Sequence, residues 1–308
     1  MDGLAPANEN GEYQRPESKH KNAKLPKRIS IENGKEENLP RLIIGRSCPW
    51  AHRTWLVYEL RSLNEKLVLI KANVDTSAGL WKLNPKWLEC ESLLELYKKC
   101  QSKPNLRATV PVIIDPTGTN NSNPEILGNE SSQLIDLLNI WPTDKHSVNL
   151  SPLELKDEIF YWKHFLQESV NNGVYKCGFA RNQRSYEKAS NTLFESLKKI
   201  DIHLSKKGPW LCGEKLTIAD VCLFPTLIRW EMIYSPLFNC GKIPLWFFEN
   251  IWEWRKRFYN LPRVSSTCDS LEWRKDYFGA LFPLRPNGII PSGPSLSKLV
   301  NAQTKTIR

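Results

Sequence analysis

The sequence lacks several signals that commonly assign a protein to a class. None of its eight cysteines forms a Cys-x-x-Cys pair, so neither a paired zinc site nor a dithiol redox motif is indicated. No apolar segment of the kind that directs secretion stands at its N-terminus, and charges interrupt every apolar stretch well short of a membrane span. We therefore expect a cytoplasmic protein with reduced thiols, no metal and no contact with a membrane.

Acidic residues are fewer than basic ones, and the excess gives a formal net charge of +10. Positive charge can serve nucleic-acid binding, because lysine and arginine release counterions from phosphates. Here the basic residues are spread along the chain, with one local excess between Arg15 and Arg28. We interpret residues 1–40 as a solvated polar tail that contains this excess, and we expect no nucleic-acid partner.

The 308 residues are enough for two domains, and 41% of them are hydrophobic, as in globular proteins. Residues 41–141 open with two short apolar runs that flank a segment of helical spacing, which predicts a β-α-β unit. The expected elements are strands at 41–45, 67–70, 110–114 and 125–127 and helices at 49–62, 81–100 and 130–139. Their order is that of a thioredoxin-like α/β domain.

Residues 142–285 have a different character. Helical spacing recurs at 152–170, 183–204, 217–234 and 244–259, with no clear strand between these segments. We predict an all-helical C-terminal domain after the α/β domain, followed by a C-terminal tail over residues 286–308.

Cys48 lies in the most informative stretch, Ser47-Cys48-Pro49-Trp50-Ala51-His52-Arg53, directly after the first predicted strand. A residue before proline avoids helical backbone angles, whereas proline itself suits the first position of a helix. Cys48 is therefore expected at a helix N-cap, where unpaired N–H groups and the helix dipole stabilise a thiolate. Cysteines in such positions have pKa values lowered from about 8.5 into a range of roughly 3.5 to 7.5. We predict a nucleophilic thiol, and the alternative is a small buried residue.

Two polar residues on the same predicted helix have two interpretations. His52 and Arg53 follow the cysteine by four and five positions, so either can add positive potential near its sulfur. The alternative, which we prefer, is that both orient the helix through packing and hydrogen bonds.

Two further segments suit an extended peptide ligand. The Val110–Pro111 bond can be cis, and the backbone of Val110 would then face outward and pair with such a ligand. An ordinary proline at a strand edge is the alternative. Glu130 and Ser131 open the next predicted helix, where N–H groups and a hydroxyl suit a carboxylate and the acidic side chain suits an ammonium group. The alternative there is simple helix capping by Asn129 or Ser131.

In combination, these segments resemble the glutathionyl-hydroquinone reductases, also called the Xi-class glutathione transferases. The motifs that carry the resemblance are Cys48-Pro49-Trp50-Ala51-His52-Arg53, Thr109-Val110-Pro111-Val112 and Asn129-Glu130-Ser131-Ser132. It continues through Gly173-Val174-Tyr175-Lys176-Cys177-Gly178-Phe179-Ala180, the capping-box segment Leu216-Thr217-Ile218-Ala219-Asp220 and Gly288-Ile289-Ile290-Pro291-Ser292-Gly293-Pro294. The resemblance thus covers residues 41–294.

The resemblance implies a reaction at sulfur that consumes glutathione. The Cys48 thiolate would attack the glutathione sulfur of a glutathionyl-hydroquinone, the hydroquinone would leave, and a second glutathione would release oxidised glutathione from the mixed disulfide. One thiol suffices for this sequence, which agrees with the lack of a Cys-x-x-Cys pair. A homodimer is also expected from the family.

The resemblance also implies the residues of the site. Glutathione would be held by Trp81, Val110, Glu130 and Ser131. The aromatic part of the substrate would meet Tyr175, Tyr234 and Tyr277, whose phenols can donate to the quinol oxygens. For each tyrosine the alternative is a core aromatic residue with a satisfied hydroxyl.

Two other functions remain open. One is an Omega-like thioltransferase or dehydroascorbate reductase that uses Cys48 on other substrates. The other is a non-catalytic binding module of the transferase fold, for which an unreactive Cys48 and no retention on immobilised glutathione are expected.

Overall fold

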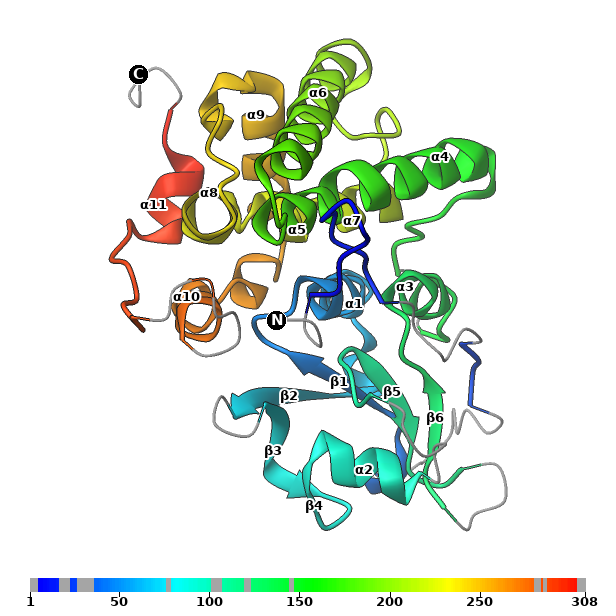
Figure 1. Cartoon of the computed structure of the whole chain (residues 1–308). Coiled ribbons are helices and arrows are strands. Elements are labelled where there is room, and N and C mark those ends of the chain that lie inside the picture. Colours follow the sequence, from blue (N-terminus) through cyan, green and yellow to red (C-terminus); the bar gives the residue numbers. More distant parts are fainter. Residues whose placement is uncertain are drawn as a thin grey trace. The chain divides into compact units, whose positions relative to one another are not determined.

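The computed structural model describes residues 5–16, 23–26, 36–75, 79–100, 107–118, 123–143, 147–279, 284 and 287–303. The chain forms two compact units (Figure 1). We call Ser18–Asn149 the α/β unit, and Met1–Glu17 together with Leu150–Arg308 the helical unit. No helix among the described residues is long and apolar enough to cross a membrane.

The α/β unit is built on a six-stranded sheet with the order β4-β3-β2-β1-β5-β6. The strands are β1 (Arg41–Gly45), β2 (Val68–Asp75), β3 (Leu80–Trp87), β4 (Cys90–Ser92), β5 (Val112–Asp115) and β6 (Glu125–Gly128). The helices are α1 (Pro49–Leu60), α2 (Leu93–Lys99) and α3 (Ser131–Asn139). β1 and β2 are parallel and joined through α1, as the sequence predicts, whereas the other strand pairs are antiparallel. Every residue of β1 is buried, so its apolar run forms the centre of this sheet.

The prediction of a single helix over residues 81–100 is wrong for its first half. Residues 80–92 form β3 and β4, which extend the sheet beyond β2, and helix α2 begins only at Leu93 (Figure 1). Pro85 lies inside β3 and would interrupt a helix, because it has no N–H group to donate. Leu88 and Glu89 both have positive φ angles and make the turn between the two strands.

The N-terminal residues 23–26 lie along the outer edge of the sheet. The backbone N–H of Lys24 donates to the carbonyl of Leu127 at 2.9 Å, and its ammonium group pairs with Glu125. These contacts cover β6, the strand that would otherwise leave its edge open.

The described residues of the helical unit contain helices and no strand. The helices are α4 (Lys156–Leu166), α5 (Gly173–Gly178), α6 (Gln183–Lys207), α7 (Ile218–Leu227), α8 (Ser235–Leu237), α9 (Glu249–Tyr259), α10 (Ser270–Phe278) and α11 (Leu296–Asn301). Single π-helical turns follow α4 at Gln167–Asn171 and precede α8 at Trp230–Tyr234. The long predicted helices therefore exist, but two of them end in a wider turn.

A capping box fixes the start of α7. The buried carboxylate of Asp220 accepts hydrogen bonds from the backbone N–H and the hydroxyl of Thr217 at 3.0 and 3.2 Å. The same carboxylate accepts from the N–H of Leu211 and the indole of Trp254. Asp220 thus joins the start of α7, the preceding loop and α9 at one buried point.

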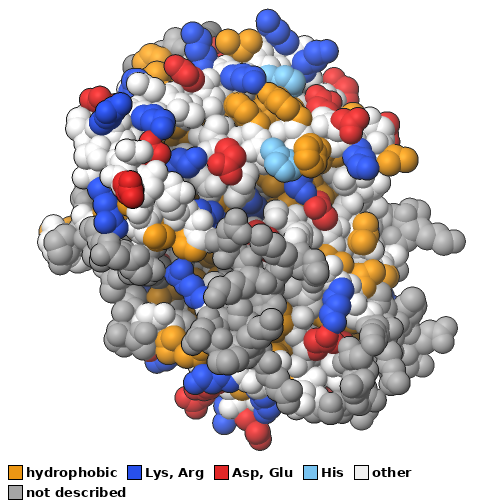
Figure 2. Space-filling model, turned by 45° about the vertical axis from the view of Figure 1, so that its right-hand side comes forward, with side chains coloured by type: hydrophobic (Ala, Val, Ile, Leu, Met, Phe, Trp, Pro, Cys, Tyr) orange, Lys and Arg blue, Asp and Glu red, His pale blue; other side chains and the backbone are white. Residues whose placement is uncertain are grey.

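Two terminal segments belong to the helical unit. Residues 5–16 lie beside α5 (Figure 1), where Ala5 and Tyr13 are buried. At the other end, α11 packs on α9, and the indole of Trp252 donates to the carbonyl of Ala302 at 3.1 Å. On the face drawn in Figure 2, basic side chains lie among acidic and hydrophobic ones and form no single patch over the coloured atoms.

Candidate functional site

Cys48 caps the N-terminus of α1 in the α/β unit. Its backbone is extended, with φ −72° and ψ 116°, and Pro49 takes the first helical position, as expected for a residue before proline. The sulfur accepts a hydrogen bond from the N–H of Ala51 at 3.5 Å. A sulfur in this place faces the positive end of the helix dipole, an arrangement that favours the thiolate over the thiol.

Val110 lies beside this sulfur. Its carbonyl oxygen is 3.7 Å from the Sγ of Cys48, and the Val110–Pro111 bond is cis. The two motifs that the sequence separates by more than sixty residues therefore meet in one place. This leaves the backbone of Val110 next to the point where a peptide sulfur would approach Cys48.

Tyr97 supports the Val110 segment, and sequence reasoning missed it. Its hydroxyl donates to the carbonyl of Thr109 at 2.9 Å, and the side-chain amide of Asn129 donates to the same hydroxyl at 3.2 Å. Asn129 also donates to the hydroxyl of Thr109 at 3.3 Å. Burial raises the pKa of Tyr97, so its phenol keeps the proton that it donates. The network links α2, the residue before Val110 and the residue before Glu130.

Glu130 and Ser131 lie at the start of α3. The carboxylate of Glu130 accepts from the N–H of Ser132 at 3.3 Å, so Glu130 rather than Asn129 or Ser131 is the capping residue. Glu130 is partly exposed, which leaves its second carboxylate oxygen within reach of a ligand ammonium group. The hydroxyl of Ser131 is buried, and it has no hydrogen-bond partner among the residues that the structure describes. A ligand carboxylate would supply that partner.

Trp81 lies over the turn that precedes Cys48. It belongs to β3 and pairs with Val74 of β2. A Cβ atom placed on Gly45 would lie only 2.4 Å from the Trp81 ring, so the indole rests directly on the end of β1. The N–H of Cys48 bonds to the carbonyl of this glycine at 3.1 Å. Trp81 therefore packs against Gly45, the residue to which the backbone of Cys48 is hydrogen-bonded.

His52 and Arg53 are almost fully buried, 1% and 2% exposed. The guanidinium of Arg53 stacks on the Trp50 ring at 4.5 Å, and the His52 ring lies 6.2 Å from that of Trp55. These contacts favour the interpretation that both side chains orient α1 through packing.

The three candidate tyrosines form one cluster in the helical unit. The hydroxyl groups of Tyr175 and Tyr277 are 3.0 Å apart, and the Tyr234 ring lies 6.0 Å from that of Tyr175 and 6.3 Å from that of Tyr277. All three are buried, and burial raises the pKa of Tyr175 and of Tyr277 well above that of an ordinary phenol. The cluster therefore offers neutral phenols, which can donate hydrogen bonds.

Five of the other cysteines have surroundings that disfavour a thiolate. Burial raises the pKa of Cys100, Cys212 and Cys268 to about 12, and it also raises the pKa of Cys90 and Cys240. Within the described part of the chain, no three His, Cys, Asp or Glu side chains are grouped so that they could hold a metal ion.

Comparisons with known proteins identify the family to which the chain belongs. The family model for the glutathione S-transferase N-terminal domain matches residues 47–139, and that for the C-terminal domain matches residues 183–262. The chain is 31% identical to glutathionyl-hydroquinone reductase PcpF of Sphingobium chlorophenolicum over 263 residues, which cover 82% of each protein. It is 29% identical to glutathione S-transferase omega-like 2 of Schizosaccharomyces pombe over 304 residues, 94% of this chain and 95% of that protein.

Among solved structures, the glutathione-bound form of YqjG, a glutathione transferase homologue from Escherichia coli K-12, superposes with a TM-score of 0.76. The two sequences are 29% identical, and the match covers 85% of this chain and 87% of YqjG. These similarities confirm the predicted fold class, a thioredoxin-like domain followed by a helical transferase domain.

Proposed function

Because the chain belongs to the glutathionyl-hydroquinone reductases, the Xi-class glutathione transferases, we propose that it removes glutathione from glutathionyl-hydroquinones. That it is a glutathione-dependent enzyme follows from the family, and glutathione is its co-substrate. The proposal adds the substrate class and the nucleophile, Cys48.

The proposed reaction has two displacements at sulfur. The Cys48 thiolate attacks the glutathione sulfur of the aryl thioether, the carbon–sulfur bond breaks, and the aryl carbon takes the electron pair and a proton to give the hydroquinone. A glutathione thiolate then attacks the mixed disulfide and releases oxidised glutathione and the Cys48 thiolate. In total, the aryl thioether and one glutathione give the hydroquinone and glutathione disulfide.

The hydrogen bond from the Ala51 N–H to the Cys48 sulfur is the observation that carries this proposal. This hydrogen bond places the sulfur at the N-terminus of α1. The Val110 backbone lies beside the sulfur, and the cysteinyl part of glutathione would pair with that backbone. Glu130 and Ser131 would receive the ammonium and carboxylate of the γ-glutamyl end, and Trp81 would cover the tripeptide.

The tyrosine cluster supports an aromatic leaving group. In our proposal Tyr175, Tyr234 and Tyr277 donate hydrogen bonds to the quinol oxygens and stabilise charge that develops on the ring as the sulfur departs. The raised pKa of Tyr175 and Tyr277 supports this role, because a phenolate could not donate. We also propose a cytoplasmic homodimer, for which sedimentation of the purified protein is the direct measurement of the oligomeric state.

Turnover of a glutathionyl-hydroquinone by the purified protein tests the proposal. We expect hydroquinone and glutathione disulfide in equal amounts from wild type and from Cys100→Ser, and no product from Cys48→Ser. Cys100 is a suitable control because it is a partly exposed thiol in the same unit. Absence of turnover in wild type would contradict the hydroquinone substrate.

An Omega-like thioltransferase is the second candidate, and the similarity to the omega-like transferase of Schizosaccharomyces pombe favours it. A mixed disulfide of glutathione with a small thiol, and dehydroascorbate, would then be turned over through Cys48 while the aryl thioether is not. If the protein is instead a binding module without activity, Cys48 would not react with an alkylating reagent such as iodoacetamide, and the protein would not be retained on immobilised glutathione.

A further inference from the structure

Residues 5–16, which we call the N-terminal segment, pack on the start of α6 through a turn at Gly11. Gly11 has a φ of +77°, and a Cβ atom there would lie 2.5 Å from the side-chain amide of Asn182. The turn is therefore restricted to glycine both by its backbone angle and by its close approach to the start of α6. An isolated bridge between Ala7 and Tyr13 closes the segment around this turn.

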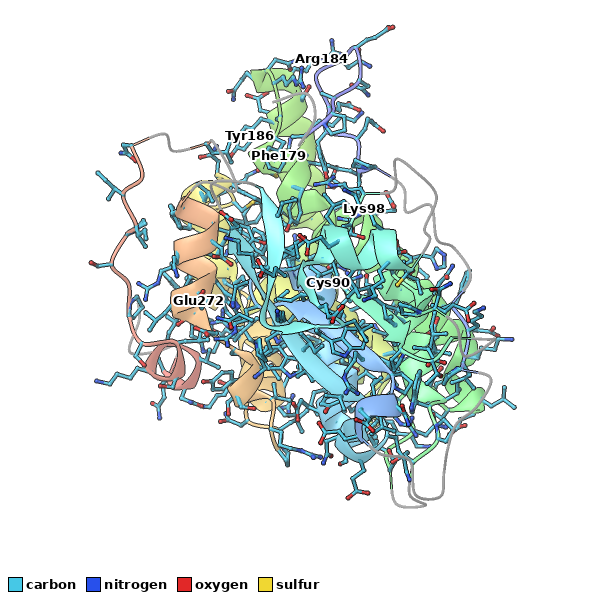
Figure 3. The ribbon with its side chains drawn as sticks, turned by 90° about the horizontal axis from the view of Figure 1, so that it is seen from below. Cys90, Lys98, Phe179, Arg184, Tyr186 and Glu272 are labelled. Carbon is cyan, nitrogen blue, oxygen red and sulfur yellow. The ribbon has the colours of Figure 1, made fainter. Side chains whose placement is uncertain are left out.

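Polar contacts hold the segment along the first turns of α6. The side chains of Asn182 and Ser185 both donate to the carbonyl of Asn10, at 2.9 and 2.6 Å. The further contacts are Arg181 N–H to Gly11 O at 3.0 Å, the Arg181 guanidinium to Ala5 O at 3.3 Å, and Lys188 to Glu12 at 2.7 Å. Figure 3 shows Arg184 and Tyr186 on this part of α6, with Phe179 just before it.

Tyr13 is the aromatic residue that this segment brings to the tyrosine cluster. It is 7% exposed, and its ring lies 5.5 Å from Phe179 and 6.3 Å from Tyr175, nearly parallel to the latter at 30°. Aromatic rings at these separations stabilise one another beyond the apolar area that they bury.

Tyr175 is thereby enclosed by aromatic rings. The rings of Phe238, Tyr234 and Phe179 lie at 5.2, 6.0 and 6.2 Å from that of Tyr175, and all three belong to residues 179–238. Tyr13 adds a ring from a segment more than 150 positions away in the sequence, and the Tyr175 hydroxyl faces that of Tyr277. One of the rings packed around Tyr175 thus belongs to a segment that polar contacts hold on α6.

We propose that Tyr13 is a positioning residue of the aromatic site and that it sets the selectivity for aryl over small non-aromatic substrates. This inference rests on the proposed function. The N-terminal segment holds the ring of Tyr13 in contact with that of Tyr175. Because this contact limits rotation of the Tyr175 side chain, its hydroxyl stays directed toward the leaving hydroquinone. Loss of the Tyr13 ring lets Tyr175 turn, so hydrogen bonds to the quinol oxygens weaken, whereas exchange at a small disulfide does not use them.

The ratio of two activities tests this inference. We would measure kcat/KM for a glutathionyl-hydroquinone and for 2-hydroxyethyl disulfide with each variant. We expect Tyr13→Ala to lower the ratio of the first to the second about tenfold or more, mostly through kcat, and Tyr13→Phe to restore it to within about twofold. Tyr186→Phe is the matched control, because this tyrosine contacts the carbonyl of Asn239 and lies outside the cluster.

A second variant, Gly11→Ala, tests the role of Tyr13 without removing its side chain. Gly11→Ala leaves Tyr13 in the sequence but is incompatible with the turn, so it should lift the segment and lower the ratio like Tyr13→Ala. In a Tyr175→Phe background, Tyr13→Ala should then have little further effect, because both changes act on one phenol. The midpoint of urea unfolding identifies any variant that fails to fold.

The outcomes separate the two proposals. If wild type does not reduce the aryl thioether, the proposed function fails and this inference fails with it. If wild type is active and both Tyr13→Ala and Gly11→Ala keep its ratio, the inference alone is overturned. Additive losses in the Tyr13→Ala/Tyr175→Phe double variant would also overturn it, because they would show that Tyr13 acts independently of Tyr175.

Discussion

The Cys48 sulfur lies 3.7 Å from the carbonyl oxygen of Val110 and accepts a hydrogen bond from the helix that it caps. The carbonyl is an acceptor for the thiol, while the helix N-terminus favours the thiolate. Deprotonation therefore removes a weak hydrogen bond from the S–H group to Val110, and the resulting thiolate is stabilised by the dipole of α1. A ligand backbone that occupies Val110 would remove the acceptor of the thiol and so favour the thiolate further.

Alkylation of the native protein by iodoacetamide at pH 7 tests this reading of Cys48. We expect one fast-reacting thiol per chain, on the order of a hundredfold faster than the next, because burial raises the pKa of at least five other cysteines. The fast phase should disappear in Cys48→Ser and persist in Cys100→Ser. Peptide mapping that places the fast label on another cysteine would contradict the assignment of the nucleophile.

Gly45→Ala should weaken glutathione binding without touching the thiol. The added methyl group would meet the Trp81 ring at 2.4 Å, so the indole must leave the end of β1. We expect KM for glutathione to rise about tenfold while the alkylation rate of Cys48 stays close to that of wild type. Gly79→Asn is the control, since it lies in the same hairpin with open space around it, and asparagine tolerates its φ of +66°. An unchanged KM in Gly45→Ala would remove Trp81 from the site.

Glu130→Gln should raise the Kd for glutathione by about tenfold to a hundredfold, because a charged hydrogen bond to the ligand ammonium becomes a neutral one. The amide can still accept from the N–H of Ser132, so α3 keeps its cap. Isothermal titration with glutathione and with its S-methyl derivative provides the measurement. Glu125→Gln, which removes the charge that pairs with Lys24, should bind glutathione as wild type does. Equal losses in the two variants would indicate a general effect of charge.

Local sequence signals predicted the two helix starts on which the candidate site is built. A proline after Cys48 and an acidic residue with serines after Asn129 determine helix starts, and both are found where the pattern places them. The strand pair over residues 80–92 was not predicted, because its apolar spacing fits a helix and only tertiary pairing with β2 decides between the two.

Long-range partners could not be read from the sequence. Tyr97 reaches Thr109 and Asn129, and Tyr13 reaches Tyr175, through packing that no local pattern encodes. A signal for the turn at Gly11 existed in Asn-Gly, a turn-forming pair, but nothing in the polar residues around it indicated that it docks on α6. The stretch interpreted as a solvated tail therefore contains residues with defined contacts in both units.

Alkaline pH should destabilise the protein steeply. Burial raises the pKa of Cys240 and of Tyr277 well above the ordinary values, so the folded state keeps protons that the unfolded chain releases. Stability from such a group is complete below its unfolded pKa and is lost as pH rises above it, at about 1.4 kcal/mol per pH unit. Urea unfolding under reducing conditions should show the free energy of unfolding falling from about pH 9 upward.

Cys240→Ala isolates one of these groups. The variant loses packing at every pH, but the slope of its free energy of unfolding above pH 9 should be shallower than that of wild type by about 1.4 kcal/mol per pH unit. An identical slope would mean that the Cys240 thiol ionises equally in the folded and unfolded states.

Asp220 should lose its contribution to stability in the same direction, as pH rises, but in a lower window, between about pH 4 and 6. Burial raises its pKa from 3.8 to about 6, even though it accepts four hydrogen bonds. The folded state therefore prefers the protonated acid, and this contribution to stability is complete below pH 4 and is lost as pH rises through 6. Asp220→Asn has no such titration. At pH 7 we expect it to be less stable by about 2 kcal/mol, because its amide cannot accept from all four donors.

Comparison of Asp220→Asn with wild type at several pH values separates the two effects. The difference in free energy of unfolding should widen by up to about 3 kcal/mol between pH 7 and pH 4, since only wild type gains from protonation at this site. Other carboxylates titrate in both proteins and cancel in the difference. A gap that narrows toward pH 4 would show instead that hydrogen bonds from Leu211, Thr217 and Trp254 outweigh burial and hold the carboxylate ionised. The capping box would then stabilise the helical unit as an ion rather than as an acid.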